Sequence, residues 1–162
     1  MRRVALLVSL VVTGVLASAA AASPPVKTSF SDTDVPATLS GVCEFDVDIS
    51  SDFTGTEIDY FDGSGNLTRA YVHIVEQDTF SANGTTFTGE PYTFNIEVLF
   101  DADGNITHVF ASGVTSRIVL PDGTFFLSAG RLDFVAHPES SFVLSPDFGN
   151  PGDVDAFCAA LA

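Results

Sequence analysis

The sequence predicts an all-β protein: an antiparallel meander of about eight strands that forms a closed or nearly closed β-barrel and ends in a short helix. Three observations predict this class. Apolar and polar residues alternate with a period of two, as in Cys43–Ile49. Turn residues recur roughly every eight to twelve positions, which is typical of barrels and sandwiches. No helical stretch separates the strands, so parallel crossovers are not expected. A β-sandwich is the alternative.

The chain begins with the three parts of a secretory signal peptide. Two arginines, Arg2 and Arg3, precede the apolar run Val4–Leu16, and an alanine-rich stretch ending at Ala22 offers a small-residue cleavage site. A membrane anchor is the alternative, but a spanning helix needs about 20 apolar residues. We therefore expect a signal peptide over residues 1–22, cleaved after Ala22 or Ala20, and a secreted, extracellular product.

The mature chain is expected to hold one domain. Residues 23–40 are rich in Ser, Thr, Pro and Asp, which predicts a flexible N-terminal segment. Residues 41–162 contain most of the phenylalanines and aliphatic residues, enough to form the core of a single β-barrel domain.

The strands are expected in sequence order, separated by turns. Cys43, Phe45, Val47 and Ile49 alternate with acidic residues and predict the first strand. Asn83-Gly84 predicts a tight hairpin, because both turn positions favour positive φ. Further strands are expected at residues 54–62, 67–77, 79–81, 85–87, 92–100, 106–111, 113–120, 124–128, 131–135 and 142–144.

A single helix is expected at the C-terminus. Asn150 can cap it and Pro151 suits its first turn, while two aspartates follow near its positive end. Its inward face would then consist of Val154, Phe157, Cys158 and Leu161.

The two cysteines, Cys43 and Cys158, are expected to form a disulfide, since an exported chain meets oxidising conditions. In the chain-entropy model a loop of this size contributes about 4 to 5 kcal/mol to stability. A catalytic thiol is the alternative, but no histidine lies near either cysteine in the sequence.

The net charge of the chain restricts the classes of partner that it is expected to bind. Loss of Arg2 and Arg3 with the signal peptide leaves four basic residues against 21 acidic ones, a net charge of −17. Nucleic acids and anionic membranes are therefore not expected as partners, because both require clustered Lys and Arg. The charge favours solubility, a cationic partner or divalent cations.

The candidate ligand-binding residues are Arg69, Tyr71, His73 and His108. The first three share one face of a predicted strand, and His108 lies on another strand that could meet it across the sheet. At a barrel mouth such a cluster could bind or polarise a small molecule. The alternative is a solvent-facing polar strip, because the opposite face of the same strand is the better core face.

A calcium site is weakly indicated at Asp101, Asp103 and Asn105, where oxygen ligands alternate. The glutamate expected at the twelfth position is missing, and the same residues favour a tight turn. No metal or cofactor is therefore expected.

No catalytic residue is predicted either. Carboxylate pairs such as Glu76 with Asp78 arise by chance in a chain this acidic.

Four parts of the chain resemble small secreted actinobacterial proteins of unassigned role: Cys43-x-Phe45-x-Val47, the Asp-Gly hairpins, Ser128–Phe134 and the tail Phe157–Ala162. Some of these are similar to the barrels of allene oxide cyclases and, more distantly, lipocalins. The resemblance implies a barrel able to enclose an apolar ligand. It supplies no catalytic motif.

The leading hypothesis is therefore a secreted, non-enzymatic β-barrel that binds a small apolar ligand or an extracellular partner. An isomerase or cyclase of the allene-oxide-cyclase type, and a structural or interaction protein of the cell envelope, are the alternatives. The sequence leaves the oligomeric state open.

Overall fold

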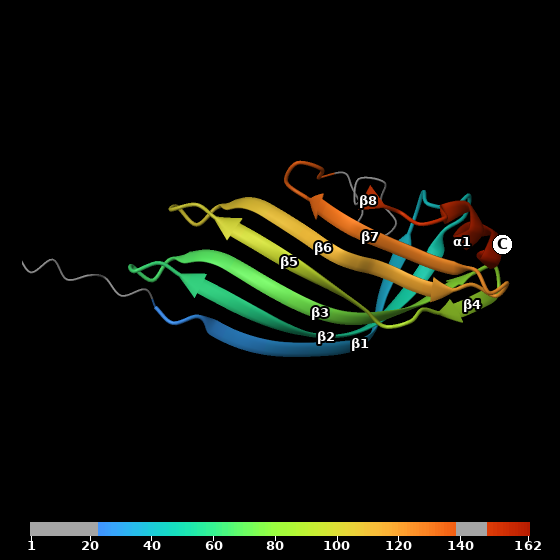
Figure 1. The fold of residues 1–162 in the computed structure, drawn as a ribbon, viewed down its shortest axis with the longest axis horizontal. Helices are drawn as coiled ribbons and strands as arrows, with labels where there is room; N and C mark the ends of the chain where they lie inside the picture. The colour runs from blue at the N-terminus through green and yellow to red at the C-terminus, as the bar shows by residue number, and fades with distance from the viewer. Residues whose placement is uncertain (1–22, 139–148) are drawn as a thin grey trace, which may run out of the picture.

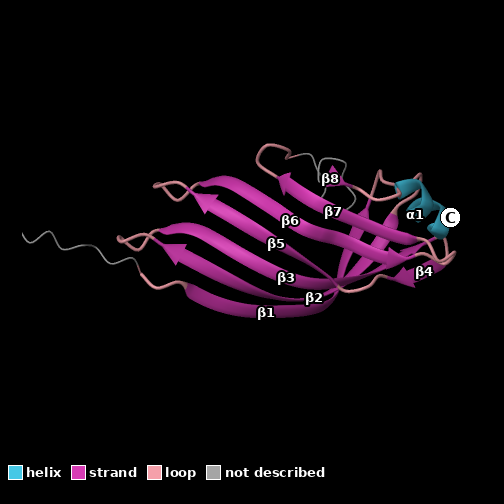
Figure 2. Ribbon diagram, in the orientation of Figure 1, coloured by secondary structure: helices cyan, strands magenta, loops and turns pink. Residues whose placement is uncertain are grey.

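The computed structural model describes residues 23–138 and 149–162, which form one long twisted antiparallel sheet and one helix (Figures 1 and 2). This confirms an all-β meander of eight strands with a short C-terminal helix. The elements are β1 (Val26–Leu39), β2 (Val47–Phe61), β3 (Leu67–Ala82), β4 (Thr85–Thr88), β5 (Tyr92–Phe100), β6 (Ile106–Val119), β7 (Phe125–Asp133), β8 (Gly149–Asn150) and α1 (Val154–Leu161).

The strands follow the order β1-β2-β3-β5-β6-β7-β8, with β4 paired to β3. Each pair is antiparallel. In the part of the chain that the structure describes, β1 and β8 are opposite edges that do not pair, so the sheet is not closed.

The predicted signal peptide and the strand expected at residues 142–144 lie outside the described ranges. Within those ranges, no helix is long and apolar enough to cross a membrane.

Several strands predicted as separate pieces are continuous. The runs at 43–49 and 54–62 largely merge into β2, which begins at Val47, and those at 67–77 and 79–81 merge into β3. Polar residues at the expected breaks do not interrupt the ladder, because they satisfy one another across it. The Ser51 hydroxyl, for example, donates to Asp78 of the neighbouring strand at 2.6 Å.

The segment expected to be flexible instead contains β1, a correction to the sequence prediction. Val26–Leu39 pairs with β2 along nearly its whole length, with a bulge between Asp32 and Val35. Its polar composition reflects exposure at the sheet edge, since β2 supplies its backbone hydrogen bonds. The one aromatic residue of β1, Phe30, packs over Gly55, where an added Cβ would collide with its ring.

The predicted hairpin at Asn83-Gly84 is confirmed, with φ of 51° and 85° at its two residues. It joins β3 to β4, and its tip lies near α1: the Asn83 side-chain amide donates to the carbonyl of Leu161 at 3.1 Å.

The main core lies at the end of the sheet that α1 covers (Figure 1). Phe157 of α1 is fully buried there, with ring centroids 5.3 Å from Phe80 and 5.4 Å from Phe126. The predicted inward positions Phe157 and Leu161 are therefore confirmed. The buried members of this core are Leu39, Val47, Ile49, Phe80, Ile118, Leu120, Phe126, Phe157 and Leu161.

The helix cap differs from the prediction. Asp153, not Asn150, caps α1, and its carboxylate accepts from the backbone N–H of Ala156 at 3.0 Å. Asn150 accepts from Gly152 N–H instead. Gly152 has φ of 80°, which separates Asn150 from the helix, so α1 begins only at Val154.

The Cys43–Cys158 disulfide is confirmed, with a Cα–Cα distance of 5.5 Å. It ties the segment before β2 to α1 and is consistent with an oxidising environment.

Candidate functional site

The two faces of the sheet carry different side chains. On β3 the even-numbered residues form what we name the Phe80 face, which continues into the core, and the odd-numbered residues form the Arg69 face. The Phe80 face of β3 consists of Ala70, Val72, Ile74, Glu76, Asp78 and Phe80, and the Arg69 face includes Arg69, Tyr71, His73 and Val75.

Two carboxyl groups on the Phe80 face meet a tyrosine and a serine, and we name Ser51, Glu76, Asp78 and Tyr92 the Asp78 cluster. Strand register brings them together, because Ser51 lies opposite Asp78 and Tyr92 lies opposite Glu76. Asp78 is 1% exposed and Tyr92 is 5% exposed. The cluster is therefore built into the interior of the sheet.

The hydrogen bonds of the Asp78 cluster are unequal. Ser51 Oγ donates to Asp78 Oδ1 at 2.6 Å, and the Tyr92 hydroxyl lies 2.6 Å from Asp78 Oδ2 but 3.0 Å from Glu76 Oε1. A phenol has one proton, and the shorter distance assigns it to Asp78. Glu76 then faces the Tyr92 oxygen without a donor between them, which favours the protonated form of Glu76.

The pKa shifts of the cluster agree with this assignment of the Tyr92 proton. Burial, followed by the neighbouring charge of Asp78, raises the pKa of Glu76 to about 7. Burial, together with the charges of both carboxylates, also raises the pKa of Tyr92 well above its ordinary value. Tyr92 therefore stays a donor, while Glu76 changes its charge near neutral pH.

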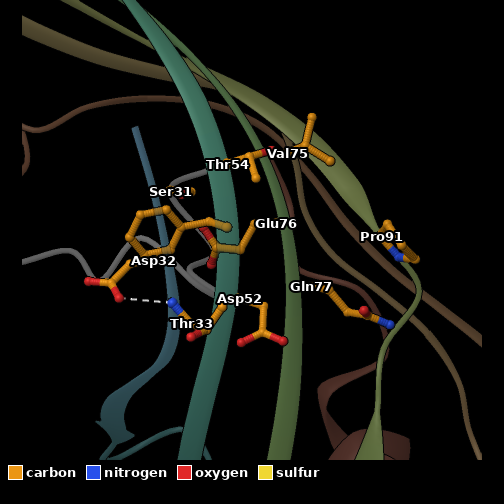
Figure 3. Close-up of a pocket in the computed structure, with 10 residues that line it drawn as sticks. Ser31, Asp32, Thr33, Asp52, Thr54, Val75, Glu76, Gln77 and Pro91 are labelled. Carbon is orange, nitrogen blue, oxygen red and sulfur yellow. Dashed lines mark hydrogen bonds between the residues drawn. The ribbon is translucent and has the colours of Figure 1, made fainter. Parts of the chain in front are cut away.

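An open hollow of about 430 Å³ adjoins Glu76 (Figure 3). Three carboxyl-bearing residues, Asp32, Asp52 and Glu76, contribute to its wall, and no basic residue does. The remainder of the wall is mainly apolar or uncharged. The lining residues are Ser31, Asp32, Thr33, Asp52, Phe53, Thr54, Val75, Glu76, Gln77 and Pro91.

Arg69, Tyr71 and His73, predicted at a barrel mouth, lie on the Arg69 face, opposite the apolar side chains. Arg69 Nε lies 2.6 Å from Glu97 Oε1, and its guanidinium lies over the rings of Tyr60 and Tyr71. This placement matches the polar strip that was the alternative interpretation.

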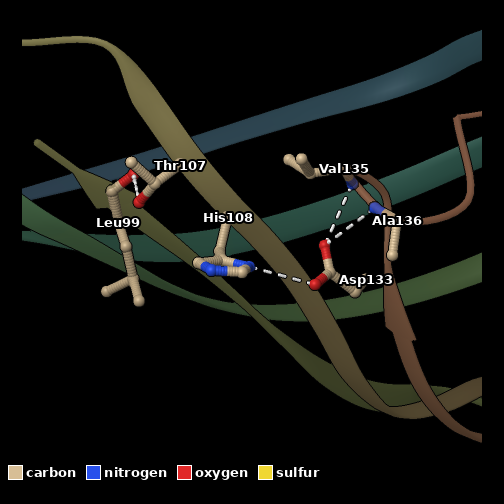
Figure 4. A network of polar contacts seen from close by, with 6 residues as sticks. All are labelled: Leu99, Thr107, His108, Asp133, Val135 and Ala136. Atoms are coloured by element: carbon tan, nitrogen blue, oxygen red, sulfur yellow. Dashed lines mark hydrogen bonds and ion pairs between the residues drawn. The ribbon is translucent and has the colours of Figure 1, made fainter.

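The two strand histidines do not meet. His73 pairs with Asn95, their Nδ1 and Oδ1 atoms 2.8 Å apart. His108 lies instead in the row of Arg69, with Leu99 between them. Its Nδ1 is 3.1 Å from Asp133, whose other oxygen accepts from backbone N–H groups (Figure 4). The four predicted residues thus share a face but split into three local groups: Arg69 with Tyr71, His73, and His108.

The weak calcium candidate forms a tight turn. Asp101 Oδ1 accepts from the backbone N–H of Asn105 at 2.8 Å and of Asp103 at 2.9 Å. These bonds, that from Asn105 first, lower the pKa of Asp101. Among the residues that the structure describes, no group of three or more His, Cys, Asp or Glu is arranged to hold a metal ion.

Comparison of the chain with protein-family models, curated proteins and solved structures gave no match. The lumen implied by the resemblance to allene oxide cyclases and lipocalins therefore stays an expectation, and no functional residue is carried over from another protein.

The Asp78 cluster was missed because Glu76 and Asp78 were interpreted as a chance pair. Their spacing held a usable signal: both fall on the same strand face as Ala70, Val72 and Ile74. Carboxylates that interrupt an apolar face are costly to bury unless they are paired or functional.

Proposed function

We propose that the protein binds a small, mainly apolar molecule that carries an amine or another hydrogen-bond-donating end. One observation supports this above all: Glu76 is among the residues that line the hollow, and the Tyr92 hydroxyl beside it donates to Asp78 rather than to Glu76. A ligand donor placed at Glu76 would supply a further hydrogen bond to this carboxyl.

The charge of the hollow favours a cationic end over an anionic one. Asp32, Asp52 and Glu76 are among the residues that line it, and no Lys, Arg or His is. An ammonium group gains a charge-assisted hydrogen bond at Glu76. A carboxylate ligand would meet like charges and lose affinity.

Binding of three probes of equal chain length, decylamine, decanol and decanoate, tests the proposal by isothermal titration calorimetry at pH 8. We expect decylamine to bind best and decanoate worst. Glu76→Gln removes the charge while keeping the shape, and should weaken decylamine about tenfold, or about 1.4 kcal/mol. Binding of decanol should change little.

The matched control is Glu44→Gln, which removes an exposed carboxylate outside the hollow. It separates binding at Glu76 from general attraction to an acidic protein. Equal binding of all three probes, or the same loss in both variants, would contradict the proposal.

The location of the protein, outside the cytoplasm, is part of the same proposal. Export by the predicted signal peptide accounts for an oxidised Cys43–Cys158 pair, so we place the ligand outside the cytoplasm. Closure of the sheet into a barrel would shield the Phe80 face further, but binding at the hollow does not require it.

An isomerase is a second candidate, favoured by the same carboxyl. A base with a pKa of about 7 beside a hydroxyl donor is suited to proton transfer at neutral pH. In that case Glu76, rather than the predicted Arg69, Tyr71 and His73, would carry the proton.

A further inference from the structure

All basic residues of the expected mature chain lie on one side of the sheet. Lys27 lies opposite Ile58, which lies opposite Tyr71, so it shares the Arg69 face. Arg131 joins the row of His73 through Asn95 and Ser112. Arg117 is exposed between two core residues of β6, Ser116 and Ile118, and therefore points away from the core. A chain with a net charge of −17 thus gathers its few cations on a single face.

The Arg69 face is ordered in three rows that cross the strands. Neighbouring strands lie about 4.8 Å apart, a spacing comparable to the length of one sugar ring. The rows are Tyr60–Arg69–Leu99–His108, then Lys27–Ile58–Tyr71–Glu97–Phe110–Asp133, then Thr56–His73–Asn95–Ser112–Arg131.

Flat side chains on this face hold one another in place. The Arg131 guanidinium lies 4.2 Å from the centroid of Phe110, whose ring stacks on His108 at 5.2 Å with an interplanar angle of 8°. Arg69 lies between Tyr60 and Tyr71 in the same manner. A ligand that docks here loses little side-chain entropy, because the groups are already ordered.

The face is accessible. The side chains of Arg69 and His108 are 40% and 47% exposed. The helix α1 packs against the opposite face, through Phe157 and Leu161. Arg69 and His108 are therefore accessible from solution on this face.

The charges of the face suit an uncharged partner that both donates and accepts hydrogen bonds. Arg69 is paired with Glu97, and His108 contacts Asp133, so donors and acceptors alternate with little net charge. Polyanions would be repelled by the remainder of the molecule. Sugar hydroxyls match paired donors and acceptors, and the apolar faces of sugar rings match Tyr60, Tyr71 and Phe110.

We infer that the Arg69 face binds a neutral polysaccharide, whose successive sugar units lie across strands β2, β3, β5 and β6. No residue of the three rows lines the hollow beside Glu76, so the inference gives the protein two partners: a small molecule and an extracellular glycan.

Retention of the purified, disulfide-intact mature chain on insoluble chitin and insoluble cellulose tests the inference. We expect retention on at least one of them in 0.5 M salt. Tyr71→Ala and Phe110→Ala should each lower it at least tenfold. The matched control is Phe125→Ala, which removes an exposed aromatic ring that also lies beside an arginine, Arg117, but stands outside the three rows.

Folding is checked by thermal melting of each variant. Nuclear magnetic resonance of the unaltered protein with chitohexaose or cellohexaose avoids variants altogether, and shift changes should cluster on residues of the three rows. No retention on either polymer, equal retention by the row variants and the unaltered chain, or shift changes on the Phe80 face alone would each overturn the inference. Binding to alginate alone, lost in salt, would show an anionic partner instead and would also overturn it.

Discussion

At the scale of single residues, the Asp78 cluster brings two carboxyl groups together with only two hydroxyl donors, those of Ser51 and Tyr92. Asp78 receives the two shortest hydrogen bonds of the cluster, from Ser51 and Tyr92, whereas Glu76 lies farther from the Tyr92 oxygen and next to the Asp78 carboxylate. Partial burial and the neighbouring Asp78 carboxylate make an ionised Glu76 costly, and the carboxylic acid relieves this cost by retaining its proton. Glu76 therefore links the stability of the fold to pH.

Glu76→Gln should stabilise the protein in a pH-dependent way. The pKa of Glu76 is raised from 4.5 to about 7 in the folded chain. Between these values the native state binds more protons than the unfolded state, so stability falls as pH rises through this window, and the loss stays complete above it. Glutamine does not ionise, so the variant does not lose this stability as the pH rises. We expect no difference between variant and parent near pH 4.5, and a gain of about 1 kcal/mol at pH 8 after allowance for solvent screening.

Thermal melting at pH 4.5 and pH 8 measures this difference. Glu44→Gln is the control, because it removes an exposed carboxylate that lies outside the Asp78 cluster. An equal effect of Glu76→Gln at both values would show that Glu76 is not the titrating group.

The sequence predicted side-chain direction better than it predicted site residues. Period-two alternation assigned Ala70, Val72 and Ile74 to the core face, and the strand places them on the same face as the buried Phe80. The same alternation places Glu76 and Asp78 there. Their role still depends on Tyr92, a partner on another strand whose register the sequence does not reveal. Pairing of that kind is fixed by tertiary structure.

At the scale of elements, the sequence predicted the turns better than it predicted where strands are interrupted. Asn83-Gly84 specifies its hairpin locally, through the positive φ of two residues. The length of β2 and β3 is set by pairing with neighbours, which carries the ladder through polar stretches. For the same reason β1, polar and mostly exposed, forms a strand because β2 lies beside it.

The docking of β1 predicts an unusual effect of Gly55→Ala. Alanine normally stabilises a strand relative to glycine by about 0.5 to 1 kcal/mol. Here the new methyl group meets the Phe30 ring, which must leave its position over Gly55 and near Phe53. We expect Gly55→Ala to destabilise the chain by about 1 kcal/mol, comparable to moderate overpacking.

A double-mutant cycle with Phe30→Ala checks the cause of this effect. Without the ring, Gly55→Ala should become neutral or stabilising, so the two substitutions should couple strongly in urea denaturation. If Gly55→Ala stabilises the parent chain as well, β1 does not pack on β2 as described.

At the scale of the whole molecule, the two ends of the sheet differ in what stabilises them. The end covered by α1 contains the main core and the disulfide, whereas the far end relies on strand pairing and on a smaller cluster around Ala111 and Leu132. Both proposed binding surfaces involve residues away from α1. Ligands at the hollow and at the three rows of the Arg69 face would therefore stabilise the part of the molecule that has the smaller core.

The disulfide should dominate the stability of the α1 end. Cys43 and Cys158 are 115 residues apart, and opening a loop of that length costs about 4 to 5 kcal/mol in the chain-entropy model. We expect Cys43→Ser/Cys158→Ser to fold, because Phe157 and Leu161 still pack in the core, but to melt about 12 °C lower. Treatment of the parent chain with a reductant should reproduce this shift, and the same reductant should leave the double variant unchanged. A shift of less than 3 °C would mean that packing of α1, rather than the covalent link, holds this end of the sheet together.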